Sequence, residues 1–159
     1  MTTQASLAAR GGPDGLRHKR ARLSAGTPAA DAVAAVRAAI GEWQVPVDRG
    51  LAAVLASDLV INAVTSGTGE SLMLSVRCTS VQFRVEVHDR SFTGDSWESA
   101  ESEAKADRGL QLAAMTAAES GHYRTPAGRA VFYVLAFAPA AATGGGQAPR
   151  GAASGDGEP

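Results

Sequence analysis

The 159-residue sequence lacks several features that would assign it to a particular class of protein. Its single cysteine, Cys78, cannot form a disulfide within the chain and has no metal-ligand spacing around it, so we expect a reducing, cytoplasmic location. No hydrophobic run is long enough to span a bilayer. The N-terminus has no apolar core of the signal-peptide type. We therefore expect no association with a membrane.

The sequence also lacks an excess of either charge. It has 15 Lys and Arg residues against 16 Asp and Glu residues, which gives a formal net charge of -1. This balance does not favour binding to nucleic acid or to an acidic membrane surface, so we expect neither as a partner. The length suits one domain that can bury a hydrophobic core.

Periodicity is missing at both ends of the chain. Residues 1–15 and 139–159 are rich in Gly, Ala and Pro, and both stretches are predicted to be disordered tails. Residues 16–138 then form the domain. Within it, residues 90–105 are polar and poor in aliphatic side chains, which predicts a long loop that acts as a functional lid or is disordered.

The hydrophobic pattern of residues 16–138 predicts helices and strands in a definite order. Helices are expected over 28–43, 47–66 and 107–119, and strands over 17–25, 72–78, 81–87, 122–125 and 129–137. The last strand is apolar on both faces and should be central. We therefore predict an α/β (α+β) two-layer sandwich, with three helices on one face of a mixed, mainly antiparallel sheet.

The predicted helix over 47–66 carries two polar side chains on an otherwise apolar face. Asp58 and Asn62 lie four residues apart, on the stripe that Leu51 and Leu55 begin. A buried polar group costs free energy unless it has a partner, and a bound metal with a polyphosphate would satisfy both groups. A helix end that simply leaves the core and meets water is the alternative, and spacing alone leaves both open.

Five short segments together resemble a known family. They are Trp43-Gln-Val-Pro46, Asp58-Leu-Val-Ile-Asn-Ala63, Asp89 after a strand, Asp107-Arg-Gly-Leu110 before a helix, and Gly128-Arg-Ala-Val-Phe132. In this order they resemble the Bergerat-fold (GHKL) ATP-binding domains of gyrase, histidine kinases, heat-shock chaperones and mismatch-repair proteins. The most similar branch is that of the anti-sigma-factor serine/threonine kinases, and the resemblance covers roughly residues 23–137.

The resemblance implies a role for each matched residue. Asn62 would help to hold Mg²⁺, and Asp58 would be the catalytic base that activates the attacking hydroxyl or water. Asp89 would accept a hydrogen bond from the adenine amino group of ATP. The lid segment that would surround the ATP phosphates comprises Arg108, Gly109 and Leu110.

The function implied is that of an ATP-binding regulatory protein of the anti-sigma-factor type. Its partners would be a sigma factor, an anti-sigma antagonist, or both, and homodimers are common in the branch. The protein would be a serine/threonine kinase acting on the antagonist. The alternative is a catalytically degenerate module that binds its partner without phosphoryl transfer, because Asp58 is shorter than the usual Glu and the lid has one glycine, Gly109. Trp97, in the long loop, either anchors the lid or marks a partner-binding patch.

Overall fold

The computed structural model of the protein describes residues 15–67, 70–90 and 110–138, and they form three helices and five strands. In chain order the elements are β1 (Arg17–Arg22), α1 (Pro28–Trp43), α2 (Arg49–Ser66), β2 (Leu72–Cys78), β3 (Gln82–Asp89), α4 (Gln111–Thr116), β4 (Glu119–Thr125) and β5 (Gly128–Ala136). The predicted order of helices and strands is confirmed for these residues. Of the predicted tail 1–15 and the predicted loop 90–105, the structure describes only Gly15 and Arg90, and the predicted tail 139–159 lies outside the described residues.

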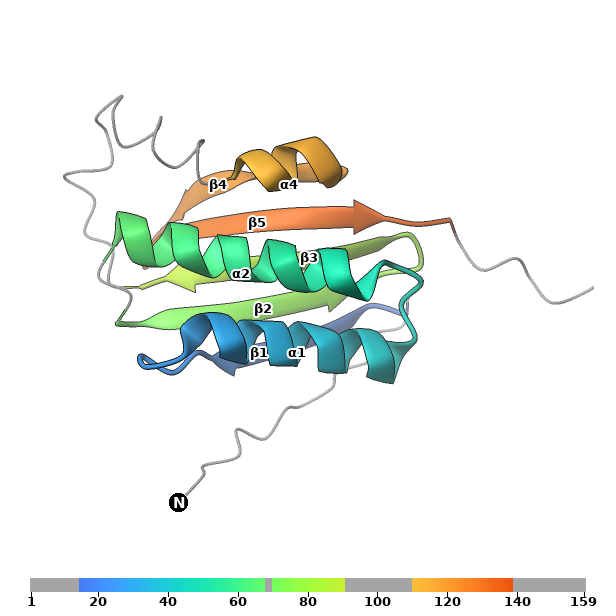
Figure 1. Ribbon diagram of the computed structural model, residues 1–159, viewed down its shortest axis with the longest axis horizontal. Coiled ribbons are helices and arrows are strands. Elements are labelled where there is room, and N and C mark those ends of the chain that lie inside the picture. Colours follow the sequence, from blue (N-terminus) through green and yellow to red (C-terminus); the bar gives the residue numbers. More distant parts are fainter. Residues whose placement is uncertain (1–14, 68–69, 91–109, 139–159) are drawn as a thin grey trace, which may run out of the picture.

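The five strands form one sheet in the order β1-β2-β3-β5-β4 (Figure 1). Every pairing is antiparallel, so the expectation of a mixed sheet is wrong for the described strands. The reason is the connection between β1 and β2, which consists of two helices. The chain reverses direction three times, from β1 to α1, from α1 to α2 and from α2 to β2, so β2 runs opposite to β1. As predicted, β5 lies inside the sheet, between β3 and β4.

The third helix is shorter than predicted. It was expected over 107–119, but α4 spans Gln111–Thr116, and residues 107–109 lie outside the described part of the chain. The Ala118 amide donates a hydrogen bond to the Val134 carbonyl at 2.9 Å, so the chain already pairs with β5 there. Gly121 consequently lies within β4 and does not end a helix. Pairing with a neighbouring strand overrides the intrinsic helix propensity of this Ala-rich segment, as tertiary contacts often do.

The helices cover one face of the sheet and leave the other open, which makes two layers (Figure 1). Leu55 and Leu59 of α2 pack with Phe83 of β3 and Tyr133 of β5 in a core that excludes solvent. The Tyr133 hydroxyl donates a hydrogen bond to the Ala52 carbonyl at 2.8 Å, which fixes α2 against β5. Among the described residues, no helix is both long and apolar enough to cross a membrane.

Candidate functional site

The helix α2 carries the two polar residues singled out from the sequence. Its N-terminus is fixed by Asp48, whose carboxylate accepts a hydrogen bond from the Leu51 amide at 2.8 Å. Asp58 is half-buried, whereas Asn62 is only 4% exposed. Burial raises the pKa of the Asp58 carboxyl above its ordinary value. The prediction that these two residues adjoin the apolar stripe of α2 is confirmed, with Asn62 the deeper of the two.

The Asn62 side chain binds an arginine from the sheet. The Arg129 guanidinium donates a hydrogen bond from Nη2 to Asn62 Oδ1 at 2.8 Å, and Arg129 is 2% exposed. Burial lowers the pKa of Arg129 to about 10, while the negative charge of Asp89 acts in the opposite direction. The structure thus places a cation directly on the amide oxygen that the sequence assigned to Mg²⁺.

Asp89 completes this group of buried polar side chains. It is the last residue of β3, lies opposite Arg129 in the register with β5, and is 3% exposed. Gly67, directly after α2, lies against the Asp89 side chain: a Cβ atom added to Gly67 would be only 2.2 Å from Asp89 Oδ2. We call Asn62, Asp89 and Arg129 the buried polar cluster. It joins α2, β3 and β5 at one end of the sheet.

The sequence reasoning assigned no role to Arg129, although the strand pattern contained the signal. Side chains alternate along a strand, so Arg129 and Tyr133 share a face of β5. Because Tyr133 belongs to the hydrophobic core, Arg129 had to face the helices as well. A charged residue on that face requires a buried partner.

The predicted lid segment is only partly described. Arg108 and Gly109 lie outside the described residues, as does Trp97. Leu110 is buried and directly precedes α4, where its carbonyl accepts a hydrogen bond from the Ala114 amide at 2.9 Å. Among the described residues, the Leu110 side chain therefore packs in the hydrophobic core.

The buried polar cluster does not fit a magnesium ion as it is arranged. Mg²⁺ requires oxygen ligands in a near-octahedral shell. Asn62 Oδ1 instead accepts a hydrogen bond from a guanidinium, whose positive charge repels a second cation. Across the described residues, no group of three or more His, Cys, Asp or Glu side chains could hold a metal ion. Asp89 is 3% exposed, and its Oδ2 lies close to Gly67.

Comparison with known proteins assigns no family: no family model matches the chain, and no curated protein matches it. We therefore infer the function from the chemistry of the buried polar cluster and from the exposed surfaces.

Proposed function

We propose that the protein is a regulatory binding module of the anti-sigma-factor type, which recognises a protein partner without phosphoryl transfer. The observation that carries this proposal is the hydrogen bond from Arg129 to Asn62 inside the buried polar cluster. The guanidinium supplies internally the positive charge that Mg²⁺ would bring. The cluster then holds α2 against β3 and β5.

We propose in addition that the protein has the Bergerat fold. Its support is the order of the elements, with two helices between β1 and β2, and a single helix layer over an antiparallel sheet. The positions of Asn62 on α2 and Asp89 at the end of β3 also agree with the motif order of that family. Fold alone does not determine function, so the proposal depends on the chemistry of the cluster.

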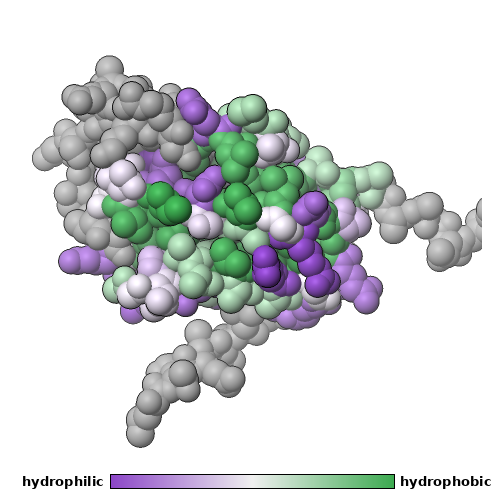
Figure 2. All heavy atoms as spheres, viewed as in Figure 1, coloured by the Kyte–Doolittle hydropathy of each residue, from purple (hydrophilic) through white to green (hydrophobic). Residues whose placement is uncertain are grey.

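The helix layer offers an exposed apolar surface to a partner. Figure 2 shows hydrophobic side chains gathered over α2 and α4. The exposed apolar residues of the two helices are Val54, Ile61 and Val64 on α2, and Leu112 and Met115 on α4. Met115 is 84% exposed and Ile61 is 55% exposed. Neighbouring apolar side chains that remain exposed are typical of protein interaction sites, and a flexible methionine adapts readily to a partner.

The test combines a binding measurement with a chemical one. The full-length protein is titrated calorimetrically with Mg·ATP, and in parallel with each purified sigma factor of its own genome. We expect no saturable heat with Mg·ATP, and one sigma factor whose affinity is the same with and without Mg·ATP. Ile61→Asp together with Met115→Asp should weaken that complex, whereas Arg37→Asp, on the exposed side of α1, should not. Binding that requires Mg·ATP would contradict the proposal.

A second candidate function is the kinase itself, and one observation favours it. Asp58 is half-buried on α2 near the buried polar cluster, and burial raises the pKa of its carboxyl. Such a shift makes a carboxylate a better proton acceptor, as a general base requires. If radiolabelled phosphate from ATP reached a serine-bearing antagonist protein, and Asp58→Asn abolished the transfer while Thr65→Ala did not, the kinase would replace the binding module.

A further inference from the structure

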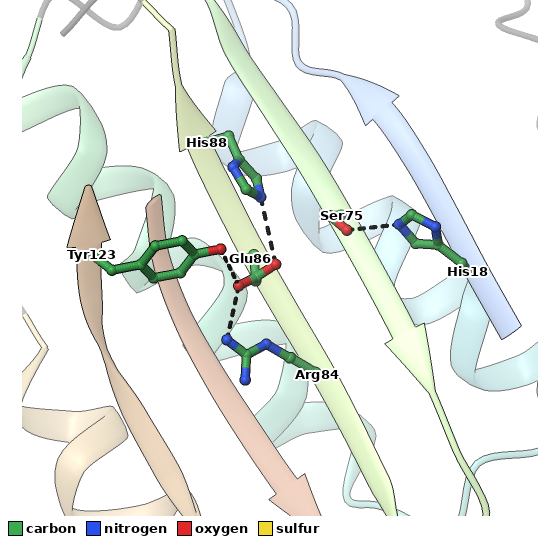
Figure 3. Close-up of polar contacts among 6 residues, drawn as sticks. All are labelled: His18, Ser75, Arg84, Glu86, His88 and Tyr123. Carbon is green, nitrogen blue, oxygen red and sulfur yellow. Dashed lines mark hydrogen bonds and ion pairs between the residues drawn. The ribbon is translucent and has the colours of Figure 1, made fainter. Parts of the chain in front are cut away.

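The sheet face away from the helices is rich in cationic side chains. Residues directly opposite one another in an antiparallel sheet point to the same side, so the register identifies the side chains on this face. We call it the open sheet face, and Figure 3 looks onto part of it, with the helices behind the strands. Its basic residues are His18, Arg20 and Arg22 on β1, Arg77 on β2, Arg84 and His88 on β3, and Arg90 just after β3.

Like charges stand opposite one another on this face. Arg77 is the direct register partner of Arg84. Like charges in such positions destabilise a sheet. Burial, and then the charges of Arg77 and Arg20, lower the pKa of the His18 imidazole, while the charge of Glu86 acts in the opposite direction. An anionic ligand would offset this repulsion.

One carboxylate lies in the middle of the open sheet face, and it is already fully engaged. Glu86 is 4% exposed and accepts hydrogen bonds from Tyr123 Oη at 2.7 Å and Arg84 Nη2 at 2.9 Å (Figure 3). His88 Nε2 lies 3.5 Å from its second oxygen. Burial alone would raise the pKa of Glu86, but these contacts outweigh burial and lower it to about 2. Glu119, at the edge of the sheet beyond Val134, is the other acidic residue that the register places on this face.

A hollow of about 270 Å³ opens on the same face. Its lining residues are Arg20, Met73, His88, Arg90, Thr125, Pro126 and Ala127. Within the described part of the chain, neither Arg20 nor Arg90 forms an ion pair. Two guanidinium groups, an imidazole and a hydroxyl are the donors that recognise a phosphate group.

An aromatic ring lies beside this hollow. Tyr123 is 37% exposed, and its ring meets the His88 ring edge-on at a centroid distance of 6.4 Å. Its ring centroid lies 6.1 Å from that of Phe132. The hydrogen bond from its hydroxyl to Glu86 holds the ring in place. A fixed, partly exposed ring among cationic groups is typical of surfaces on which nucleobases stack.

We propose that the open sheet face binds single-stranded nucleic acid, with a phosphate in the hollow between Arg20 and Arg90 and a base against Tyr123. Arg20 and Arg22 lie two residues apart on β1, about 7 Å, and Arg77 and Arg84 extend the cationic positions over β2 and β3. A single phosphate would engage only the hollow, whereas a strand with many phosphates engages the whole face. The proposal departs from the expectation drawn from net charge, because the net charge of -1 sums the charges of all 159 residues. It does not depend on the proposed function, which concerns the helix layer.

The test measures the affinity of the full-length protein for a fluorescently labelled oligothymidylate of about 20 nucleotides. We expect the affinity to fall steeply between about 50 and 200 mM salt. The double variant Arg20→Glu/Arg90→Glu should bind at least about tenfold more weakly and lower the salt slope by about two. The control Arg37→Glu reverses one charge on the helix layer, which is half the charge change of the double variant, and should alter the affinity less than about twofold. Tyr123→Leu removes the ring and should weaken binding while the salt slope stays unchanged.

Three results would overturn the proposal. A loss of binding free energy from Arg37→Glu that is half the loss from the double variant, in proportion to the charge changed, would show attraction to net charge alone. Displacement of the oligonucleotide by poly-glutamate at equal charge concentration would identify an acidic polypeptide as the ligand. Displacement by inorganic phosphate, with no gain in affinity from longer oligonucleotides, would identify a site for a single anion. Circular dichroism of each variant confirms that a loss of affinity is not a loss of fold.

Discussion

Glu86 offers the sharpest test of the electrostatics of the open sheet face. Replacing it by glutamine keeps nearly the same shape and one acceptor oxygen, removes the negative charge and converts the second oxygen into an NH2 donor. In the native protein that charge is buried and accepts hydrogen bonds from Tyr123 and Arg84, with His88 close by. The glutamine variant therefore isolates the free energy that these cationic and polar neighbours gain from the charge.

The size of the effect follows from the pKa of Glu86. It falls from an ordinary 4.5 to about 2, and each unit of pKa corresponds to about 1.4 kcal/mol. The ionised Glu86 therefore contributes about 3 kcal/mol to the free energy of unfolding at neutral pH. Because the folded-state pKa is the lower one, this contribution is complete well above pH 4.5. It is lost as the pH falls from about 4.5 towards 2.

Urea unfolding followed by far-ultraviolet circular dichroism measures this directly. At pH 7 we expect Glu86→Gln to lower the free energy of unfolding by about 3 kcal/mol. At lower pH the two proteins should converge, because a protonated carboxyl resembles an amide. Glu42→Gln is the control: Glu42 is an exposed partner of Lys19, so its loss should cost less than about 1 kcal/mol. A Glu86→Gln protein as stable as the parent at pH 7, or a difference that does not change with pH, would refute this account of Glu86.

Three further substitutions test the interior, each by the midpoint of urea unfolding. Arg129→Met should lower the free energy of unfolding by about 3–5 kcal/mol, because it leaves Asp89 buried without its cation. Adding Asp89→Asn should restore much of that loss. A double variant no more stable than Arg129→Met would contradict the pairing of Arg129 with Asp89. Tyr133→Phe removes a buried hydrogen bond to an α2 carbonyl and should cost about 1 kcal/mol; no change would show that the bond is not formed in solution. Gly67→Ala should lower the free energy of unfolding by about 1–3 kcal/mol, since its Cβ would overlap the Asp89 carboxylate. Gly121→Ala is the control and should cost less, because its Cβ would lie 3.4 Å from its nearest neighbour. Equal losses from the two substitutions would exclude the overlap as the cause.

The sequence predicted the elements whose pattern is local. Pro28–Trp43 matched α1 at both ends, because proline favours the first turn and Gln44 adopts the left-handed conformation that ends a helix. Leu72–Cys78 matched β2 because its alternation is complete. The third helix was predicted too long, since its last residues pair with β5, and that pairing is a tertiary contact invisible in a local window.

The candidate site was predicted only in part, for the same physical reason. The spacing of Asp58 and Asn62 placed them correctly on α2, but spacing cannot show which side chain approaches from another element. Arg129 approaches from β5, 67 residues further along the chain, and takes the amide oxygen. The basic character of the open sheet face was also missed, since the formal charge of -1 sums residues that the fold separates.

The edge strand β1 has a consequence for assembly. A sheet edge can recruit another strand from a second chain, and charged side chains along the edge prevent this. β1 has the sequence Arg-His-Lys-Arg-Ala-Arg, so two copies meeting edge to edge would align one row of positive charges with another. The sheet should not grow through β1 into a dimer or a fibre. If the protein does form a homodimer, its subunits must meet through another surface.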